Sequence, residues 1–365
     1  MISSDSGESY PDWDEFVRRT PGGDLDQSTL WSRFRQSVGF ECHRIVAREG
    51  TRIVGGAQLY TRRVGPWGLA YVPYGPLVAP EASEGVVHDL VQALMHDVSH
   101  RGALFIQPPL HGERVAAGLS ACGFTPSEVQ VAPSATLRLD VSRPVEELER
   151  GLSRMIRPYV RRWQQIGVEV RRGTREDLGL LAELHALSAQ HQRFTPMSLT
   201  YLEHLWDALD PGEHVRVFVG SVDKEPIAAD LFASFGGVLS HRIKGFDREG
   251  PHSKARVPAA VVWTAIVDAH DRGERWLDFG GIARPAATAM LEERHDADAS
   301  KARHRFKLAF GGRPVVYPTT VELIPDPALR AGLAITRSVK PGRRVIHRYT
   351  GHIRMGTSTG VRIGS

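Results

Sequence analysis

The chain has 365 residues and a formal net charge of +4, with 41% hydrophobic and 24% charged residues. This length predicts about two domains with cores of their own, and the composition is that of an ordinary globular protein. Two cysteines, Cys42 and Cys122, give neither a disulfide framework nor a metal pattern, and no run approaches the ~20 apolar residues of a membrane span. Residues 1–14 are polar and acidic without a signal-peptide core, so we expect a cytoplasmic protein.

The first part of the chain predicts antiparallel strands followed by helices. Residues 1–10 are expected to be disordered. Apolar periodicity and capping residues predict helices at Pro11–Arg19, Gln27–Val38, Gly85–His100 and Glu113–Ala121. Runs of β-forming residues between turns predict strands at His43–Arg48, Ile53–Arg63, Leu69–Tyr74, Ala103–Gln107 and Ala135–Asp140.

The second part repeats this alternation. Glu146–Ile166 is predicted to be mostly helical, with a break at Pro158, which cannot donate a helical hydrogen bond. Further helices are predicted at Glu176–Gln190, Leu199–Leu209, Pro258–Asp271 and Ala286–Glu293. Strands are predicted at Val168–Arg171, Val215–Ser221, Ile227–Phe235, Val238–Phe246, Arg275–Phe279, 305–309 and Val315–Leu323.

An internal repeat organises these elements. Ile53 and Ile227 begin similar strands after similar turns, and Gly102 and Gly273 each stand between a helix and a strand. The two offsets are nearly equal, which favours two copies of one acyltransferase-like α+β unit. We expect an N-terminal domain of residues 1–145, a C-terminal domain of residues 146–338 and a basic, flexible tail of residues 339–365.

Arginine is concentrated in two places, residues 150–175 and the tail. The first segment contains eight arginines and a single acid, Glu169. Such a cluster in a chain with a sequence pI of 9.2 favours a polyanionic partner such as RNA, although a solvated helix face is the alternative.

The string from His304 to Gly312 combines a cation, flanking aromatic residues and a glycine pair. The alternation of Phe306, Leu308 and Phe310 is typical of a strand with Lys307 facing solvent. The alternative is a functional site, because an amine beside an exposed ring can hold a nucleotide and neutralise an oxyanion.

Several segments, in order over residues 10–335, resemble the FemABX family of aminoacyl-tRNA-dependent peptidyltransferases, which are built from two GNAT-like domains. These segments are Gln27–Arg35, Tyr71–Val78, the basic helix before Gly167, Asp278–Gly281 and Phe306–Gly312. The resemblance implies an α+β fold with two GNAT-like domains in tandem, each a mixed, mostly antiparallel sheet flanked by helices.

The resemblance also implies a chemistry. Phe306 would hold the terminal adenosine of the tRNA and Lys307 would stabilise the tetrahedral intermediate. Apart from the resemblance, Asp278 at the end of a predicted strand is a candidate general base, with Asp230 and His241 on neighbouring strands. The alternative role for Asp278 is a structural cap. The tRNA-binding candidates are Arg154, Arg157, Arg161, Arg162 and Arg305. Aminoacyl-tRNA would be a co-substrate, no cofactor is expected, and we expect a monomer without DNA or an integral membrane segment.

The acceptor side departs from the family. Arg35 stands where family members have a lysine, and Met197 replaces an arginine expected to bind a diphosphate. With Tyr74 and Tyr201, these residues are the acceptor-binding candidates. The departures favour a small or peptide-like amine acceptor, as in specialised-metabolite biosynthesis. The alternatives are a transferase that builds interpeptide bridges on a lipid-linked or UDP-linked peptidoglycan precursor, an acyl-CoA-dependent N-acyltransferase, and a non-catalytic tRNA-binding protein.

Two further patterns are weak. An acyl-CoA enzyme needs an R/Q-x-x-G-x-G/A loop between a strand and a helix, and the one match, Arg52–Ala57, runs into a predicted strand. His96 and His100 form the only H-x-x-x-H pair, without a third ligand, so no metal site is expected.

Overall fold

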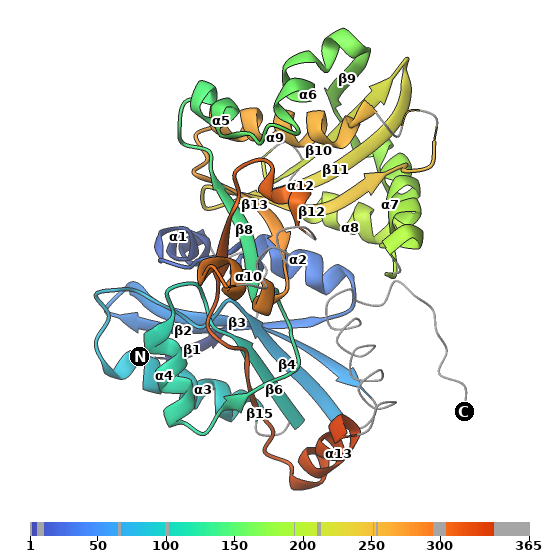
Figure 1. Cartoon of the computed structure of the whole chain (residues 1–365). Helices are drawn as coiled ribbons and strands as arrows, with labels where there is room; N and C mark the ends of the chain where they lie inside the picture. The colour runs from blue at the N-terminus through green and yellow to red at the C-terminus, as the bar shows by residue number, and fades with distance from the viewer. Residues whose placement is uncertain are drawn as a thin grey trace, which may run out of the picture. The chain divides into compact units, whose positions relative to one another are not determined.

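The computed structural model describes residues 2–5, 11–64, 67–98, 102–192, 194–209, 213–250, 252, 255–294 and 304–338 (Figure 1). The chain divides into two compact units, Met1–Ser134 with Tyr317–Ser365, and Ala135–Val316. Each unit is a mixed sheet flanked by helices, so the predicted α+β class is confirmed.

The first unit contains an eight-stranded sheet in the order β1-β2-β3-β4-β6-β15-β7, with β5 paired to β3. Its strands are β1 Ile2–Asp5, β2 Glu41–Glu49, β3 Arg52–Val64, β4 Trp67–Pro73, β5 Leu77–Val78, β6 Gly102–Gln107, β7 Thr125–Pro126 and β15 Val321–Leu323. Its helices are α1 Pro11–Arg19, α2 Thr29–Ser37, α3 Gly85–Val98, α4 Glu113–Ala121 and α13 Pro327–Ser338.

Two adjacent glycines in β3 show that helices cover both faces of this sheet. A Cβ atom at Gly55 would lie 2.9 Å from a methyl carbon of Leu90 in α3. A Cβ atom at Gly56 would lie 2.5 Å from the ring of Trp13 in α1. Because successive strand residues face opposite sides, α3 and α1 lie on opposite faces. Both helices pack so closely that only glycine fits beneath them.

The second unit contains a seven-stranded sheet in the order β14-β8-β13-β12-β11-β10-β9. Its strands are β8 Ala135–Asp140, β9 Val168–Arg172, β10 Val215–Val222, β11 Glu225–Phe235, β12 Val238–Phe246, β13 Trp276–Gly281 and β14 Arg313–Val316. Its helices are α5 Val145–Gly151, α6 Arg157–Arg162, α7 Leu178–Gln192, α8 Leu199–Ala208, α9 Val257–Asp271, α10 Arg284–Leu291 and α12 Arg305–Leu308.

Helices also cover both faces of the second sheet. A Cβ atom at Gly220 in β10 would lie 2.4 Å from Val257 in α9. A Cβ atom at Gly245 in β12 would lie 2.8 Å from Leu184 in α7. The main apolar core lies on the α9 side, where α9 packs against residues of α5, α6 and several strands. Phe310, which follows α12 by two residues, belongs to that core.

The predicted repeat is visible in the topology. In the first unit β3 and β4 are antiparallel, α3 follows, and β6 pairs with β4 in parallel. In the second unit β11 and β12 are antiparallel, α9 follows, and β13 pairs with β12 in parallel. Each unit thus contains one parallel pair with a crossover helix, at equivalent places in the chain.

Several expectations differ from the structure. Ile2–Asp5 is a strand, β1, because it finds an antiparallel partner in β2, whereas disorder was predicted for residues 1–10. The units divide the chain before Ala135 and not near residue 145, because β8 pairs with β13 and β14. Residues from Tyr317 return to the first unit, since β15 pairs with β6 and β7. The predicted tail lies outside the described residues.

Another difference concerns the string around Lys307. Residues 305–309 were predicted to form a strand, but Arg305–Leu308 is the helical turn α12. The backbone N–H of Leu308 donates to His304 and that of Ala309 to Arg305, so the local hydrogen bonds are helical.

The structure contains, within the residues it describes, no helix with the length and apolar character needed to cross a membrane.

Candidate active site

A gap between two parallel strands marks the candidate site in the second unit. β12 and β13 pair only at Val238, Leu239 and Ser240 of β12, after which the strands separate. The equivalent strands of the first unit, β4 and β6, remain paired over six successive positions. Beyond Ser240 the carbonyl groups at the end of β13 lack a strand partner on this side, so other donors can reach them.

A β-bulge in β12 lies at the point where the strands separate. Phe232 of β11 pairs with His241, but the preceding Leu231 pairs with Ile243, so Arg242 is an extra residue on β12. A bulge bends its strand and reverses the inward and outward alternation beyond it. His241 and Lys244 therefore lie on the same face of the sheet, as do their cross-strand partners Phe232 and Asp230.

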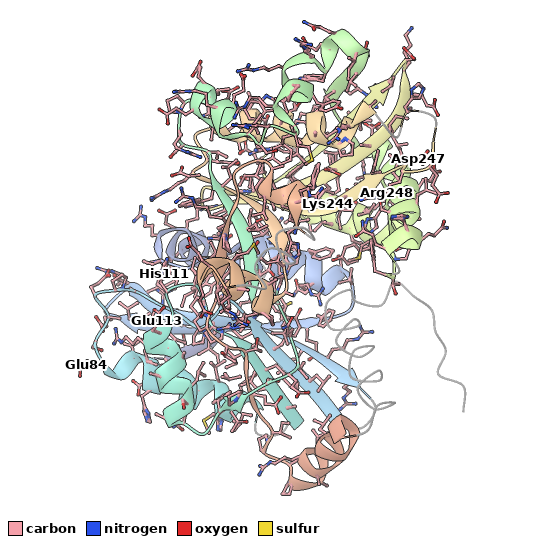
Figure 2. All side chains as sticks on the ribbon, in the orientation of Figure 1. Glu84, His111, Glu113, Lys244, Asp247 and Arg248 are labelled. Carbon is pink, nitrogen blue, oxygen red and sulfur yellow. The ribbon has the colours of Figure 1, made fainter. Side chains whose placement is uncertain are left out.

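Two lysines fill the gap and donate to three successive carbonyl oxygens of β13. Lys244 Nζ lies 3.1 Å from the Phe279 oxygen. Lys307 Nζ, on α12, lies 2.9 Å from the Gly280 oxygen and 3.1 Å from the Gly281 oxygen. Figure 2 labels Lys244 on β12. The positive φ of +79° at Gly280 turns these carbonyl groups out of the strand direction.

The two ammonium groups affect each other's protonation. Burial, and next the Lys244 cation, lowers the pKa of Lys307 to about 7, although Asp278 partly opposes this. Burial also lowers the pKa of Lys244, against the opposing effect of Asp230 and Asp278. A cation in a low-dielectric site destabilises a second cation nearby, so Lys307 can lose its proton near neutral pH.

Phe306 presents an aromatic ring beside Lys307. Its side chain is 38% exposed, which is unusual for phenylalanine. Its ring packs edge-on against Phe310 at 5.3 Å between centroids, and Phe310 in turn lies 5.8 Å from Phe279 of β13. The buried Phe310 fixes the orientation of an exposed ring, whose face is available to stack on a planar group such as a nucleobase.

Asp278 is held by three donors. Its carboxylate accepts a hydrogen bond from the Thr136 hydroxyl, one of 2.8 Å from the Gly280 N–H, and one of 2.9 Å from Arg138 Nε. The bond to Gly280 fixes the turn that presents the carbonyl groups to Lys307. This carboxylate therefore has a structural task at the site.

A buried pair, His241 and Asp230, lies beside Lys244, whose cross-strand partner is Asp230. His241 Nε2 is 2.9 Å from Asp230 Oδ2, and the imidazole stacks on Phe232 at 4.2 Å between ring centroids. Both His241 and Asp230 are buried. Burial, with a smaller effect of the Lys244 cation, lowers the pKa of His241 to about 4, so the imidazole is neutral at physiological pH.

The arginine cluster is partly neutralised by carboxylates. Arg161 pairs with Glu149, Arg171 with Asp177, and Arg175 with Asp207. Arg157 donates to the carbonyl groups of residues 150 and 152 and so holds the chain between α5 and α6.

Three of the predicted tRNA-binding arginines lack such a carboxylate partner among the described residues. Arg154, Arg162 and Arg305 are exposed, and no described carboxylate lies within 4.0 Å of any of them. These three arginines are the best placed, among the described candidates, to meet phosphates.

Three of the four acceptor-binding candidates have structural contacts within their own units. In the first unit, the buried Arg35 guanidinium lies 3.8 Å above the Phe40 ring. Tyr74 donates from its hydroxyl to the Pro133 oxygen at 3.1 Å.

In the second unit, Met197 is half-buried and precedes Ser198, which caps α8 by accepting from the Tyr201 N–H at 3.2 Å. Their acceptor contacts stay predictions.

Lys244 was not predicted from the sequence as a residue of the site. The available signal was the rarity of lysine, since only six of the 46 lysines and arginines are lysines: Lys224, Lys244, Lys254, Lys301, Lys307 and Lys340. His96 lies on α3, whereas His100 lies outside the described residues. No group of three or more metal-ligating side chains occurs among the residues that the structure describes.

Comparisons with known proteins agree with the fold. The acetyltransferase (GNAT) domain family matches residues 150–290. A solved structure of FemX covers 90% of this chain and 99% of its own, with a TM-score of 0.74 and 18% identity. A tandem GNAT protein from the clavulanic acid biosynthesis pathway covers 90% and 99%, with a TM-score of 0.52 and 15% identity. At these identities the two structures show the fold alone.

A curated relative gives more specific information. The lipid II:glycine glycyltransferase of Staphylococcus saprophyticus is 28% identical over 232 residues, or 60% of this chain and 56% of the relative. The chain thus spans about half the length of the curated relatives it matches.

These relatives correct the prediction of a small acceptor in specialised metabolism, which is wrong. Relatives matched over most of the chain are named for lipid II, which favours the peptidoglycan-precursor alternative. The prediction gave one replaced residue, Met197, more weight than the similarity of many segments. A single missing cation does not determine the acceptor class, because a phosphate can be bound by other donors.

Proposed function

We propose that this chain, which belongs to the FemABX family, transfers an amino acid from an aminoacyl-tRNA to an amine of a lipid-linked peptidoglycan precursor. The observation that carries the proposal is the pair Phe306 and Lys307 at the gap between β12 and β13. An exposed ring and an amine stand side by side there, held by the turn at Gly280.

The chemistry requires little more than orientation and charge stabilisation. The donor is an activated ester, and attack by the acceptor amine on its carbonyl carbon places negative charge on the carbonyl oxygen. Lys307, in its ammonium form, is the donor to this oxyanion, and one such donor contributes about 3–4 kcal/mol to the transition state. Phe306 stacks on the terminal adenine, which brings the ester carbonyl next to Lys307.

Asp278 acts as a positioning residue in this proposal. Its hydrogen bond to the Gly280 N–H and its pair with Arg138 keep the turn in place. Arg154, Arg162 and Arg305 supply a sequence-independent attraction to the tRNA backbone. The relatives' names suggest glycine as the amino acid and lipid II as the acceptor to test first.

An acyl-CoA donor is the second candidate because the GNAT family matches residues 150–290. The only string with the required pyrophosphate-loop pattern, Arg52–Ala57, lies inside strand β3. Its backbone N–H groups therefore do not form a loop before a helix, and this weighs against acyl-CoA.

A transfer assay distinguishes the two donors. The protein is incubated with lipid II and either glycyl-tRNA or acetyl-CoA, and the precursor is analysed by mass spectrometry. The proposal predicts an added glycine that disappears after RNase treatment of the donor. An acetylated product without RNA would contradict it, as would the absence of product from every charged tRNA in a mixed pool.

A further inference from the structure

Lys244 has the position of a functional residue, although the resemblance gives it no role. It lies on β12 after the bulge, and its ammonium group reaches across the gap to the Phe279 carbonyl. Its own carbonyl oxygen lies 2.8 Å from His185 Nδ1 on α7. Both the backbone and the side chain of Lys244 are therefore fixed.

The arrangement of the two lysines is electrostatically costly. Their ammonium groups donate to consecutive carbonyl groups, 279 for Lys244 and 280 with 281 for Lys307. No carboxylate among the described residues lies within 4.0 Å of either nitrogen atom. Two adjacent cations without an ion-pair partner favour the loss of one proton, as in enzymes that activate a lysine with a second cation.

The carboxylates that face the pair have other partners. Asp278 on β13 accepts hydrogen bonds from Arg138, Thr136 and the Gly280 N–H. Asp230 on β11 contacts His241. These carboxylates moderate the repulsion between the lysines without forming a close pair with either.

The remaining titratable neighbours do not supply a counter-charge. His241 on β12 has a lowered pKa of about 4, and burial also lowers the pKa of His185 on α7, so both are neutral at pH 7. The exposed Arg305 on α12, and His304 just before this helix, are the other neighbours. The nearby side chains therefore leave the repulsion between the two lysines in place.

We propose that Lys244 is a positioning residue for the transfer reaction, whose ammonium group holds Lys307 as a neutral amine able to accept a proton from the acceptor's ammonium group. This inference rests on the proposed function and adds a route for the proton. In that route Lys307 is the catalytic residue, and Lys244 acts through it.

Lys307 both receives and returns a proton in this route. The acceptor ammonium gives one proton to Lys307 Nζ, and the resulting amine attacks the ester carbonyl carbon to form the C–N bond. Lys307, now an ammonium group, stabilises the oxyanion. When the ester C–O bond breaks, Lys307 returns its proton to the leaving ribose oxygen. The new amide nitrogen loses its extra proton to water, so the reaction releases one proton overall.

A titration that needs no substrate tests the effect of Lys244. With only six lysines in the chain, side-chain NMR of protein labelled at the lysine Cε and Nζ atoms gives few signals, assignable by single substitutions. We expect the Lys307 signal to titrate near pH 7 in the wild type. In Lys244→Gln the midpoint should rise by about 1 pH unit or more, because a neighbouring cation is removed.

Two variants serve as controls in this titration. Lys244→Arg keeps the charge and should leave the Lys307 midpoint low. Lys224→Gln removes an exposed lysine elsewhere in the same unit and should change nothing at Lys307. A wild-type Lys307 midpoint above about 9, near that of an ordinary lysine, would overturn the inference even if Lys244→Gln failed to fold.

The pH dependence of kcat/KM with aminoacyl-tRNA tests the role in the reaction. In Lys244→Gln the acidic limb of the kcat/KM profile should move to higher pH, together with the Lys307 midpoint. In Lys244→Arg this limb should lie where it does in the wild type. A uniform loss of rate with an unmoved limb would mean a merely structural role and would overturn the inference. Absence of tRNA-dependent transfer by the wild type would instead overturn the proposed function, and the proton route with it.

Discussion

Lys307 Nζ lies 2.9 Å from the carbonyl oxygen of Gly280, a glycine whose φ of +79° sets the direction of that carbonyl group. A Cβ atom at Gly280 would stand 3.1 Å from the His241 oxygen on the neighbouring strand. The placement of the lysine on α12 thus depends on a backbone conformation that only glycine adopts easily.

Substitution of Gly280 should displace the carbonyl groups that hold the Lys307 side chain. Gly280→Ala is expected to cost about 1–2 kcal/mol in the free energy of unfolding and to lower kcat at least about tenfold, because a displaced carbonyl moves Lys307. Chemical denaturation and a transfer assay measure the two effects.

Gly273→Ala is the matched control. Gly273 has a similar φ of +73°, but a Cβ atom there would meet nothing within 4 Å. This variant should lose similar stability and keep its transfer rate. Equal losses of rate in the two variants would show that the effect at Gly280 is only one of stability.

Phe306 should govern the binding of the donor. Phe306→Ala is expected to raise the Kd for aminoacyl-tRNA about 5- to 150-fold, since a base stacked on an aromatic ring contributes about 1–3 kcal/mol. Phe306→Tyr keeps the stacking surface and should bind nearly as the wild type does. Phe194→Ala removes another exposed phenylalanine of the same unit, 42% exposed, and serves as the control in the same filter-binding measurement.

The exposed arginines should contribute to tRNA binding through charge alone. The double variant Arg154→Gln/Arg162→Gln should lower the slope of log K against log salt by up to about 1 for each phosphate that is no longer neutralised. Arg175→Gln is the control, because Arg175 is already paired with Asp207 at 3.0 Å. A salt slope that is the same in the double variant and the wild type would exclude this surface from the RNA interface.

Buried His241 should make the protein less stable in acid. Its pKa is lowered to about 4 in the folded chain, mainly by burial, against about 6.5 when unfolded. Between these values the unfolded chain binds more protons, so stability is fully present above pH 6.5 and falls as the pH decreases toward 4. The loss should reach about 3 kcal/mol.

Denaturation at several pH values checks this expectation. His241→Asn should reduce the decrease in unfolding free energy between pH 7 and pH 4.5. His88→Asn, at an exposed histidine of α3, should leave that decrease unchanged. If His241→Asn shows the full wild-type decrease, then another group is responsible for the acid sensitivity.

The sequence allowed much of the architecture to be predicted, because periodicity and turns are local. The nearly equal spacing of Ile53 from Ile227 and of Gly102 from Gly273 indicated the repeat that the two sheets show. The boundary was missed because it depends on long-range pairing, in which Val321 lies opposite Ile106 and Ala135 opposite Val316.

The site was predicted in part. Phe306, Leu308 and Phe310 fit the alternation of a strand, but Phe306 and Phe310 also fit the four-residue spacing of a helix. A window of five residues cannot distinguish these patterns. Lys244 could not be identified, because its approach to Lys307 depends on the bulge at Arg242 and on the separation of two strands after Ser240. Both are properties of register between distant segments.

The gap between β12 and β13, with Lys307 at its edge, is the proposed active site. Single-turnover transfer of glycine from saturating glycyl-tRNA to lipid II, compared between the wild type and Lys307→Met, tests it most directly. We expect a rate about 100- to 1,000-fold lower in Lys307→Met, with the Kd for the tRNA changed less than about threefold. A Lys307→Met rate within about twofold of the wild type would exclude Lys307, and the gap beside it, as the site of transfer.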